Sequence, residues 1–158
     1  MTTHGIDPAG AAARLHAEID TRVARNVILF VGDGMGDNEV TAARNYLLGP
    51  GGRFTLDGFL LTGTCTNYSM QRGAETRYNY VTDSAAAATA WATGRKSYNG
   101  GIGVDQHGTA AQTLVELARR AGMRTGIVTT EEVCDPTPAA MGAHVADRTG
   151  RGPDEMLH

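Results

Sequence analysis

The sequence predicts an α/β fold, a mostly parallel β-sheet with helices on both faces. Residues 26–32 form a continuous run of apolar, β-prone residues, which is typical of a strand buried on both faces. Stretches of this kind alternate with helical patterns along the chain, as they do where helices connect parallel strands. The 21 glycines among 158 residues indicate many tight turns and fit a loop-rich α/β protein.

Alanine content, apolar spacing and stop signals predict the helices. Apolar residues recur at helical spacing after residue 37, until Gly49-Pro50 stops the pattern. A nearly all-alanine run, in the strongest helix former, ends at Gly94. Thr137-Pro138 reads as a cap followed by the favoured first helical position. The expected helices span residues 11–17, 37–48, 84–93, 113–121 and 139–145.

Three further segments are predicted as strands. Residues 60–68 are rich in Thr and Leu, residues 78–81 form a short β-prone stretch, and residues 124–129 read as another buried strand. The polar residues 70–76 are expected to form a loop between the first two. With residues 26–32, these segments complete the alternation of strands and helices.

Composition excludes several classes of function. The chain carries 14 basic and 17 acidic residues, a formal charge of −3, without the clustered basic residues of a nucleic-acid surface. Its longest strongly apolar run is too short to cross a bilayer. Cys65 and Cys134 show no metal-binding spacing and are expected to be two buried thiols or one optional disulfide. The first 25 residues lack a secretory-signal pattern, which leaves the compartment open.

A glycine-rich turn around Asp33 is the first candidate site. The carboxylate follows a predicted buried strand, at the edge where α/β sheets place their ligands. Gly32 and Gly34 let the backbone bend and leave room for an ion beside it. A dinucleotide fingerprint is not matched, because Asp37 and Asn38 follow Gly36. Metal ligation and a plain glycine turn with an exposed aspartate both remain open.

Ser84 is the second candidate, at the start of the alanine-rich helix. The unpaired amides and dipole there would stabilise an alkoxide or a bound phosphate. Serine is also a good N-cap, so a purely structural role is a strong rival. The glycines of a hydrolase elbow are replaced by Thr82 and Ala86, and no histidine partner is nearby. A nucleophilic Ser84 would therefore need another activator, such as a metal ion.

Oxygen ligands and an arginine follow later in the chain. Asp135 and Thr137 carry the hard oxygen donors that Mg²⁺ prefers, although Thr137 could also be a helix cap. Arg148 offers a planar fork suited to two phosphate oxygens, although a lone arginine is commonly a solvated helix-end charge.

Three motifs taken together resemble the alkaline phosphatases, the bacterial members most. These are NVILFVGDGMGDNEVTAARNY, YVTDSAAAATAWATGRKSYNGGIGVD and DPTPAAMGAHVADR, which occur in that family's order and spacing from about Asn26 to Arg148. The resemblance implies an alkaline phosphatase-like sheet, represented by its N-terminal portion. It divides the chain into an arm at 1–25, part of a catalytic domain at 26–148 and a polar tail or truncation point at 149–158.

The resemblance also implies roles for single residues. Ser84 would become phosphorylated, Arg148 would bind the phosphate, and Asp83 would orient that arginine. Asp33 would bridge a catalytic Zn²⁺ and the Mg²⁺. Thr137 would ligate Mg²⁺ directly and Asp135 through water. Pro136, between them, departs from the small residue expected at that place.

The implied function is metal-dependent hydrolysis of phosphate monoesters through a phosphoserine intermediate, with two Zn²⁺ ions and one Mg²⁺ in the complete enzyme. Family members commonly act as periplasmic or secreted homodimers. The remaining zinc ligands would lie downstream of the matched region, so the chain is expected to be a partial enzyme. Alternatives are an inert fragment that needs its missing part, and a phosphodiester or sulfate-ester hydrolase. The histidines are read as surface or packing residues: His4, His16, His107, His144 and His158.

Overall fold

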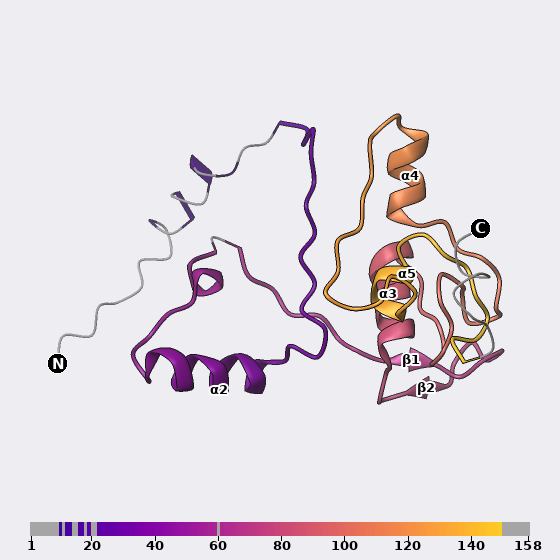
Figure 1. Cartoon of the computed structure of the whole chain (residues 1–158), viewed down its shortest axis with the longest axis horizontal. Coiled ribbons are helices and arrows are strands. Elements are labelled where there is room, and N and C mark those ends of the chain that lie inside the picture. The colour runs from indigo at the N-terminus through magenta and orange to yellow at the C-terminus, as the bar shows by residue number, and fades with distance from the viewer. Residues whose placement is uncertain are drawn as a thin grey trace. The chain divides into compact units, whose positions relative to one another are not determined.

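The computed structural model describes residues 10, 12–13, 16–17, 19, 22–59 and 61–149. The chain divides into two compact units, Met1–Thr64 and Cys65–His158, and each is described by itself (Figure 1). Of the helix predicted at 11–17, residues 12–13 and 16–17 are described and are helical, whereas residues 11, 14 and 15 and the tail from residue 150 onward lie outside the described residues.

Helix α2 (Asp37–Leu48) is the main element of the first unit, and it confirms the prediction for residues 37–48. Asp37 and Glu39 lie in its first turn, where negative charge complements the helix dipole. The helix ends at Gly49, whose φ of 73° favours glycine. A 3₁₀ helix, η1 (Thr55–Gly58), follows.

An ion pair connects α2 to η1. Arg44 donates from Nη2 to Asp57 Oδ1 at 2.6 Å and from Nε to Oδ2 at 3.0 Å. The amide of Phe54 donates to Asp57 Oδ2 at 2.7 Å, and the Arg44 guanidinium lies over the Phe54 ring, 5.6 Å from its centroid. The hydrogen bond from Arg44, supported by the Phe54 amide, holds the pKa of Asp57 below its usual range.

The second unit is built on helix α3. It contains β1 (Ser69–Met70), β2 (Tyr78–Asn79), α3 (Ser84–Thr93), α4 (Leu114–Arg120) and α5 (Pro136–Ala139). The α3 helix confirms the prediction for residues 84–93 to the residue, and Gly94 ends it in the left-handed conformation at φ 71°. The α4 helix confirms the helix predicted at 113–121, with Thr113 as its N-cap.

A small core lies between α3, α5 and the chain after α3. Ala85 and Ala88 of α3 pack with Ala139 and Ala140, and Ile102 and Val145 close the cluster. Ile102 and Val145 also exchange two backbone hydrogen bonds, at 2.9 and 2.8 Å. The small alanine side chains let these segments approach closely, and this packing joins residues far apart in the sequence.

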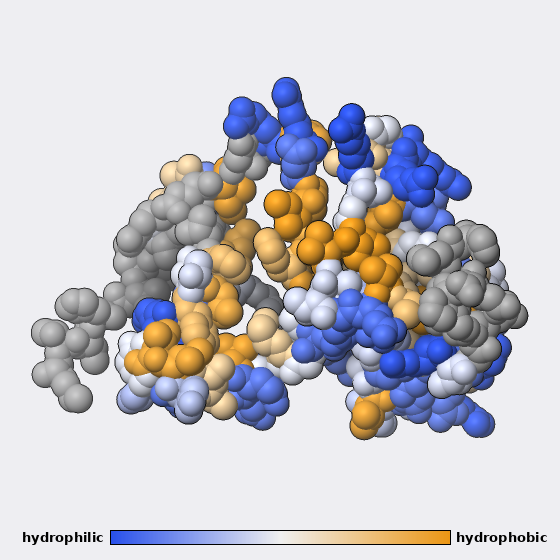
Figure 2. Space-filling model, in the orientation of Figure 1, coloured by the Kyte–Doolittle hydropathy of each residue, from blue (hydrophilic) through white to orange (hydrophobic). Residues whose placement is uncertain are grey.

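The strands predicted at 26–32, 60–68 and 124–129 are not formed in the described structure. Its sheet consists of β1 and β2, which pair antiparallel, Met70 opposite Tyr78. Buried parallel strands need hydrogen-bonded neighbours and helices on both faces, and these segments have neither. Phe30 is 89% exposed and Val128 fully exposed, and hydrophobic side chains appear on the visible surface (Figure 2). The prediction of residues 78–81 as a strand holds only for Tyr78–Asn79.

The helix predicted at 139–145 is also wrong. The single turn α5 begins at Pro136 after the N-cap Asp135, and it ends where the predicted helix would begin. Proline is favoured at the first helical position, so Asp135-Pro136 starts the turn before Thr137-Pro138 can. The chain then leaves the helix, because Val145 pairs with Ile102.

Two expectations drawn from composition concern the cysteines and membrane-spanning segments. Both cysteines are free thiols, and Cys65 is exposed, so the expectation of two buried thiols does not hold. In the part of the chain that the structure describes, no helix has the length and apolar character to span a membrane.

Replacing Asp57 by Asn is expected to loosen η1 from α2 at neutral pH. The lowered pKa of Asp57 means that its contribution to stability is present above the ordinary carboxyl pKa and is lost as pH falls through the lowered value. Hydrogen exchange at the Phe54 amide should therefore accelerate in Asp57→Asn at pH 7. Wild-type exchange, corrected for its intrinsic pH dependence, should approach that of the variant in acid. Equal protection at pH 7 would contradict the ion pair's role.

Candidate functional site

The start of α3 carries the strongest candidate group, Ser84. Asp83, not Ser84, is the N-cap, because its Oδ1 accepts a hydrogen bond from the Ala86 amide at 2.9 Å. Ser84 is the first residue of the helix and is half-buried. Its hydroxyl is therefore not used for capping, which removes the structural rival that the sequence left open.

A second bond from Asp83 connects α3 to the following loop. Its Oδ2 accepts a hydrogen bond from the Gly100 amide at 2.8 Å. The Gly100 carbonyl in turn accepts from the backbone amide of Arg148, also at 2.8 Å. One residue, Gly100, thus bridges Asp83 and the segment that carries the arginine.

The guanidinium of Arg148 lies beside the serine. Its Nη1 is 3.4 Å from Ser84 Oγ and 3.8 Å from Asp83 Oδ2. The side chains of Arg148 and Asp83 are 37% and 27% exposed. The structure therefore brings the three predicted residues, Asp83, Ser84 and Arg148, together in a solvent-accessible corner. Asp83 partly neutralises the charge of the arginine there, and a small anion can reach both Arg148 and Ser84.

Asp135 and Thr137 flank the same core as α3. Asp135 precedes α5 as its N-cap residue, but its side chain makes no capping hydrogen bond, and Thr137 lies within the turn. Because α5 packs against α3, both residues belong to the unit that holds Ser84. A carboxylate not engaged in capping and a threonine oxygen are chemically suited to Mg²⁺.

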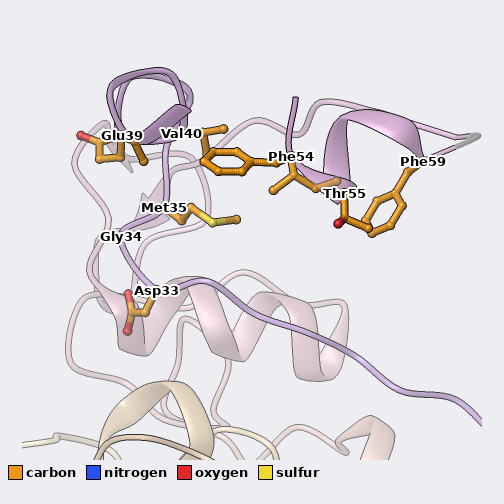
Figure 3. Close-up of a pocket in the computed structure, with 10 residues that line it drawn as sticks. Asp33, Gly34, Met35, Glu39, Val40, Phe54, Thr55 and Phe59 are labelled. Carbon is orange, nitrogen blue, oxygen red and sulfur yellow. The ribbon is translucent and has the colours of Figure 1, made fainter. Parts of the chain in front are cut away.

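Asp33 belongs to the first unit and is described there alone. It lies in a turn in which the Met35 amide donates to the Gly32 carbonyl at 3.2 Å. The turn borders a largely apolar cavity of about 720 Å³. In Figure 3 Met35 and Phe54 face each other across it, while the Asp33 carboxylate lies at the edge and points away from that ring.

The donors present do not make a zinc site. Among the described residues, no three His, Cys, Asp or Glu side chains gather closely enough to hold a metal ion. Zinc sites need three or four such ligands. The oxygen donors of Asp135 and Thr137 thus suit Mg²⁺, whereas the zinc pair implied by the resemblance has no ligand set here.

Sequence reasoning missed three residues that support the site. Gly100 is the bridging residue, and Tyr98 Oη donates to the Ala146 carbonyl at 2.6 Å, two residues before Arg148. Burial raises the pKa of Tyr98, although Arg72 nearby opposes this, so the hydroxyl stays a donor. His144 lies at the surface, as predicted, and both of its ring nitrogens have partners. These contacts join segments far apart in sequence, and no local motif indicates them.

The chain is similar in sequence to known alkaline phosphatases. A profile of the alkaline phosphatase family matches residues 24–157. The alkaline phosphatase of Escherichia coli K12 is 50% identical over 142 residues, which are 89% of this chain and 30% of that protein. Streptomycin-6-phosphate phosphatase of Streptomyces griseus is 54% identical over 136 residues, 84% of this chain and 29% of its own length. The chain thus spans about 30% of the length of these curated relatives.

Solved structures show the same likeness. The alkaline phosphatase of a psychrophilic Shewanella is 36% identical, with a TM-score of 0.57 over 76% of this chain and 30% of that one. The enzyme from the Antarctic bacterium TAB5 is 31% identical, with a TM-score of 0.56 over 73% and 31%. A TAB5 variant with magnesium bound in its M3 site has a TM-score of 0.53 at 32% identity, over 70% and 29%.

The matched residues include the whole corner formed by Asp83, Ser84 and Arg148, and the neighbours' fold supports an alkaline phosphatase-like architecture. The chain belongs to the alkaline phosphatase family.

Proposed function

We propose that this chain provides the nucleophile and the phosphate-binding arginine for hydrolysis of phosphate monoesters. The observation that carries the proposal is the position of Arg148 Nη1, 3.4 Å from Ser84 Oγ at the first turn of α3. A phosphate there would meet a guanidinium and the positive end of the α3 dipole, both of which stabilise negative charge. Asp83 is a positioning residue, because its carboxylate contacts the first turn of α3, the Gly100 amide and the Arg148 guanidinium.

The chemistry follows from this placement. Ser84 Oγ gives up its proton and forms a bond to phosphorus while the bond to the leaving-group oxygen breaks; the leaving alcohol takes up a proton, and Ser84 becomes a phosphoserine. Water then attacks phosphorus, the bond between phosphorus and Ser84 Oγ breaks, and inorganic phosphate leaves while the serine hydroxyl is restored. Charge on the equatorial oxygens in both steps would be stabilised by Arg148 and by the amides of the first helical turn.

Magnesium fits the proposal, because the candidate ligands are oxygen donors. Asp135 and Thr137 are the proposed ligands in the second unit, and Asp33 of the first unit stays a candidate ligand that the family resemblance implies. The bound ion would supply positive charge that favours the ionised form of the serine hydroxyl. The zinc ions expected in the complete enzyme find no ligand set in the described residues, so no step is assigned to them.

The names of two relatives support the choice of monoesters. One is an alkaline phosphatase, and the other is named for streptomycin 6-phosphate, itself a phosphate monoester. A single guanidinium beside the serine can pair with two unesterified phosphate oxygens. A diester also keeps two such oxygens, so the choice rests on the relatives: monoesters are proposed as the substrates and diesters as the alternative. As in family members generally, the complete enzyme is proposed to be a periplasmic or secreted homodimer.

A second candidate is that the isolated chain is inert until another polypeptide complements it. The exposed apolar side chains of residues 27–30 and Val128 favour this, because parallel strands are normally buried on both faces. The two candidates share the same corner and differ in whether the chain completes a reaction alone.

Arg148→Ala is expected to weaken the binding of inorganic phosphate by about tenfold or more, since a hydrogen bond to a charged group contributes about 1.5–3 kcal/mol. Isothermal titration of the 158-residue chain with phosphate measures this. Arg119→Ala removes an exposed arginine in the last turn of α4 and should leave the affinity unchanged. Equal affinity in wild type and Arg148→Ala would show that Arg148 is only a surface charge.

Ser84→Ala is expected to abolish turnover where the chain is complemented. Residues 1–148 can be joined to the downstream part of the E. coli relative, which shares 50% identity over the matched region. With Zn²⁺ and Mg²⁺ this chimaera should hydrolyse p-nitrophenyl phosphate, and Ser84→Ala should lower kcat by about a thousandfold or more.

The same assay separates the alternatives. Activity of the unfused chain that disappears in Ser84→Ala would exclude the inert-fragment candidate. Faster hydrolysis of bis(p-nitrophenyl) phosphate than of the monoester by the chimaera would overturn the proposed substrate class. Unaltered turnover in Ser84→Ala would remove the serine from the reaction.

A further inference from the structure

The imidazole of His144 lies between two hydrogen-bond acceptors. Its Nδ1 is 2.6 Å from the Gly103 carbonyl oxygen, and its Nε2 is 3.1 Å from Glu116 Oε1. A neutral imidazole has one donor nitrogen and one acceptor nitrogen, so it can satisfy only one of these partners. Only the imidazolium donates to both. The geometry therefore favours a charged His144, although its side chain is only 26% exposed.

Both acceptors are themselves held in place. Glu116 belongs to the capping box of α4, in which its Oε2 accepts from the Thr113 amide at 2.8 Å. Gly103 has a φ of 61°, and a Cβ there would collide with the Ala143 carbonyl and lie 2.8 Å from His144 Nδ1. Its amide donates to Thr89 Oγ1 of α3 at 2.8 Å. His144 thus connects the start of α4 to a loop anchored on α3.

The segment that begins at His144 leads directly to the arginine. Val145 and Ile102 exchange two backbone hydrogen bonds, and the Arg148 amide donates to Gly100. Residues 144–148 therefore lie along residues 100–103, which also bind Asp83 through the Gly100 amide. A shift of His144 would move this paired segment and, with it, the guanidinium beside Ser84.

Burial, one backbone carbonyl and one carboxylate determine the pKa of this histidine. Burial lowers the pKa of His144, but the Gly103 carbonyl and the Glu116 carboxylate outweigh burial and leave the pKa above its ordinary value. The Glu116 carboxylate faces the ring, while Arg120 of α4 acts on Glu116. Because the pKa is raised, the contact is complete below the ordinary histidine pKa of about 6.5 and weakens as pH rises through the higher folded value.

We propose that His144, held between the Gly103 carbonyl and the Glu116 carboxylate, is a positioning residue that keeps Arg148 beside Ser84. This inference rests on the proposed function, in which Arg148 binds phosphate. It makes phosphate binding depend on pH through His144, a residue outside the corner formed by Asp83, Ser84 and Arg148.

The test follows two signals in the 158-residue chain by NMR, the His144 ring and the Arg148 backbone amide, as pH is varied. In wild type both are expected to titrate with one midpoint. Glu116→Gln keeps a residue suited to the capping box but removes the charge that faces the ring. It should lower the His144 midpoint, and the Arg148 midpoint should move with it.

Phosphate affinity provides the second readout. His144→Gln is expected to raise the Kd for inorganic phosphate about three- to tenfold at pH 6, as for coupled residues in one network. This ratio to wild type should approach one at alkaline pH, where wild-type His144 is neutral. A general folding defect would persist at all pH values, and the titration of phosphate itself cancels in the ratio. His107→Gln, at an exposed histidine in a turn, is the matched control and should change neither readout.

The outcomes distinguish this inference from the proposed function. An Arg148 amide that does not follow His144, or that keeps its midpoint in Glu116→Gln, overturns the positioning role even where phosphate binding depends on Arg148. Linked titrations in a wild-type chain that binds no phosphate would support the positioning of Arg148 and contradict the proposed function instead.

Discussion

The candidate site depends on the two oxygens of one carboxylate. Asp83 Oδ1 accepts from the first turn of α3, and Oδ2 accepts from Gly100 after the helix has ended. These two bonds fix the backbone at Gly100 relative to the first turn of α3. The carbonyl of the same residue, Gly100, then accepts from the Arg148 amide, which connects the backbone that carries the guanidinium to Asp83. An amide side chain in its place would carry one acceptor oxygen instead of two and could not hold both amides in the same way.

The helices were predictable because their signals are local. Gly49-Pro50 and Gly94 mark helix ends, and the alanine run after Asp83 has no competing structure, so α2 and α3 match their predicted bounds. The helix at 139–145 failed for an equally local reason: two Xaa-Pro pairs follow one another, and the earlier one starts the turn. The strands are different, because a strand exists only with a partner. Residues 26–32 carry the composition of a buried strand, but composition does not specify what covers it.

The same distinction between local signals and long-range contacts applies to the residues of the candidate site. Asp83, Ser84 and Arg148 could be selected from sequence by their residue types and family resemblance, and the structure brings them together. Sequence alone could not assign the cap to Asp83 instead of Ser84, since both residues are good caps. Nor could it find Gly100, Tyr98 or His144, whose contacts cross up to 48 residues of intervening chain. Asp33 remains a candidate from sequence, because it lies in the other unit.

The contact between Arg148 and Ser84 joins residues separated by 64 positions, and both residues lie in the same compact unit. The alanine core and the Ile102–Val145 pairing beneath it use residues of that unit alone. Loop-closure entropy grows only slowly with length, so a separation of this size is modest for a folding domain. The corner formed by Asp83, Ser84 and Arg148 therefore depends on contacts made within one compact unit, and its geometry can form together with that unit's own core.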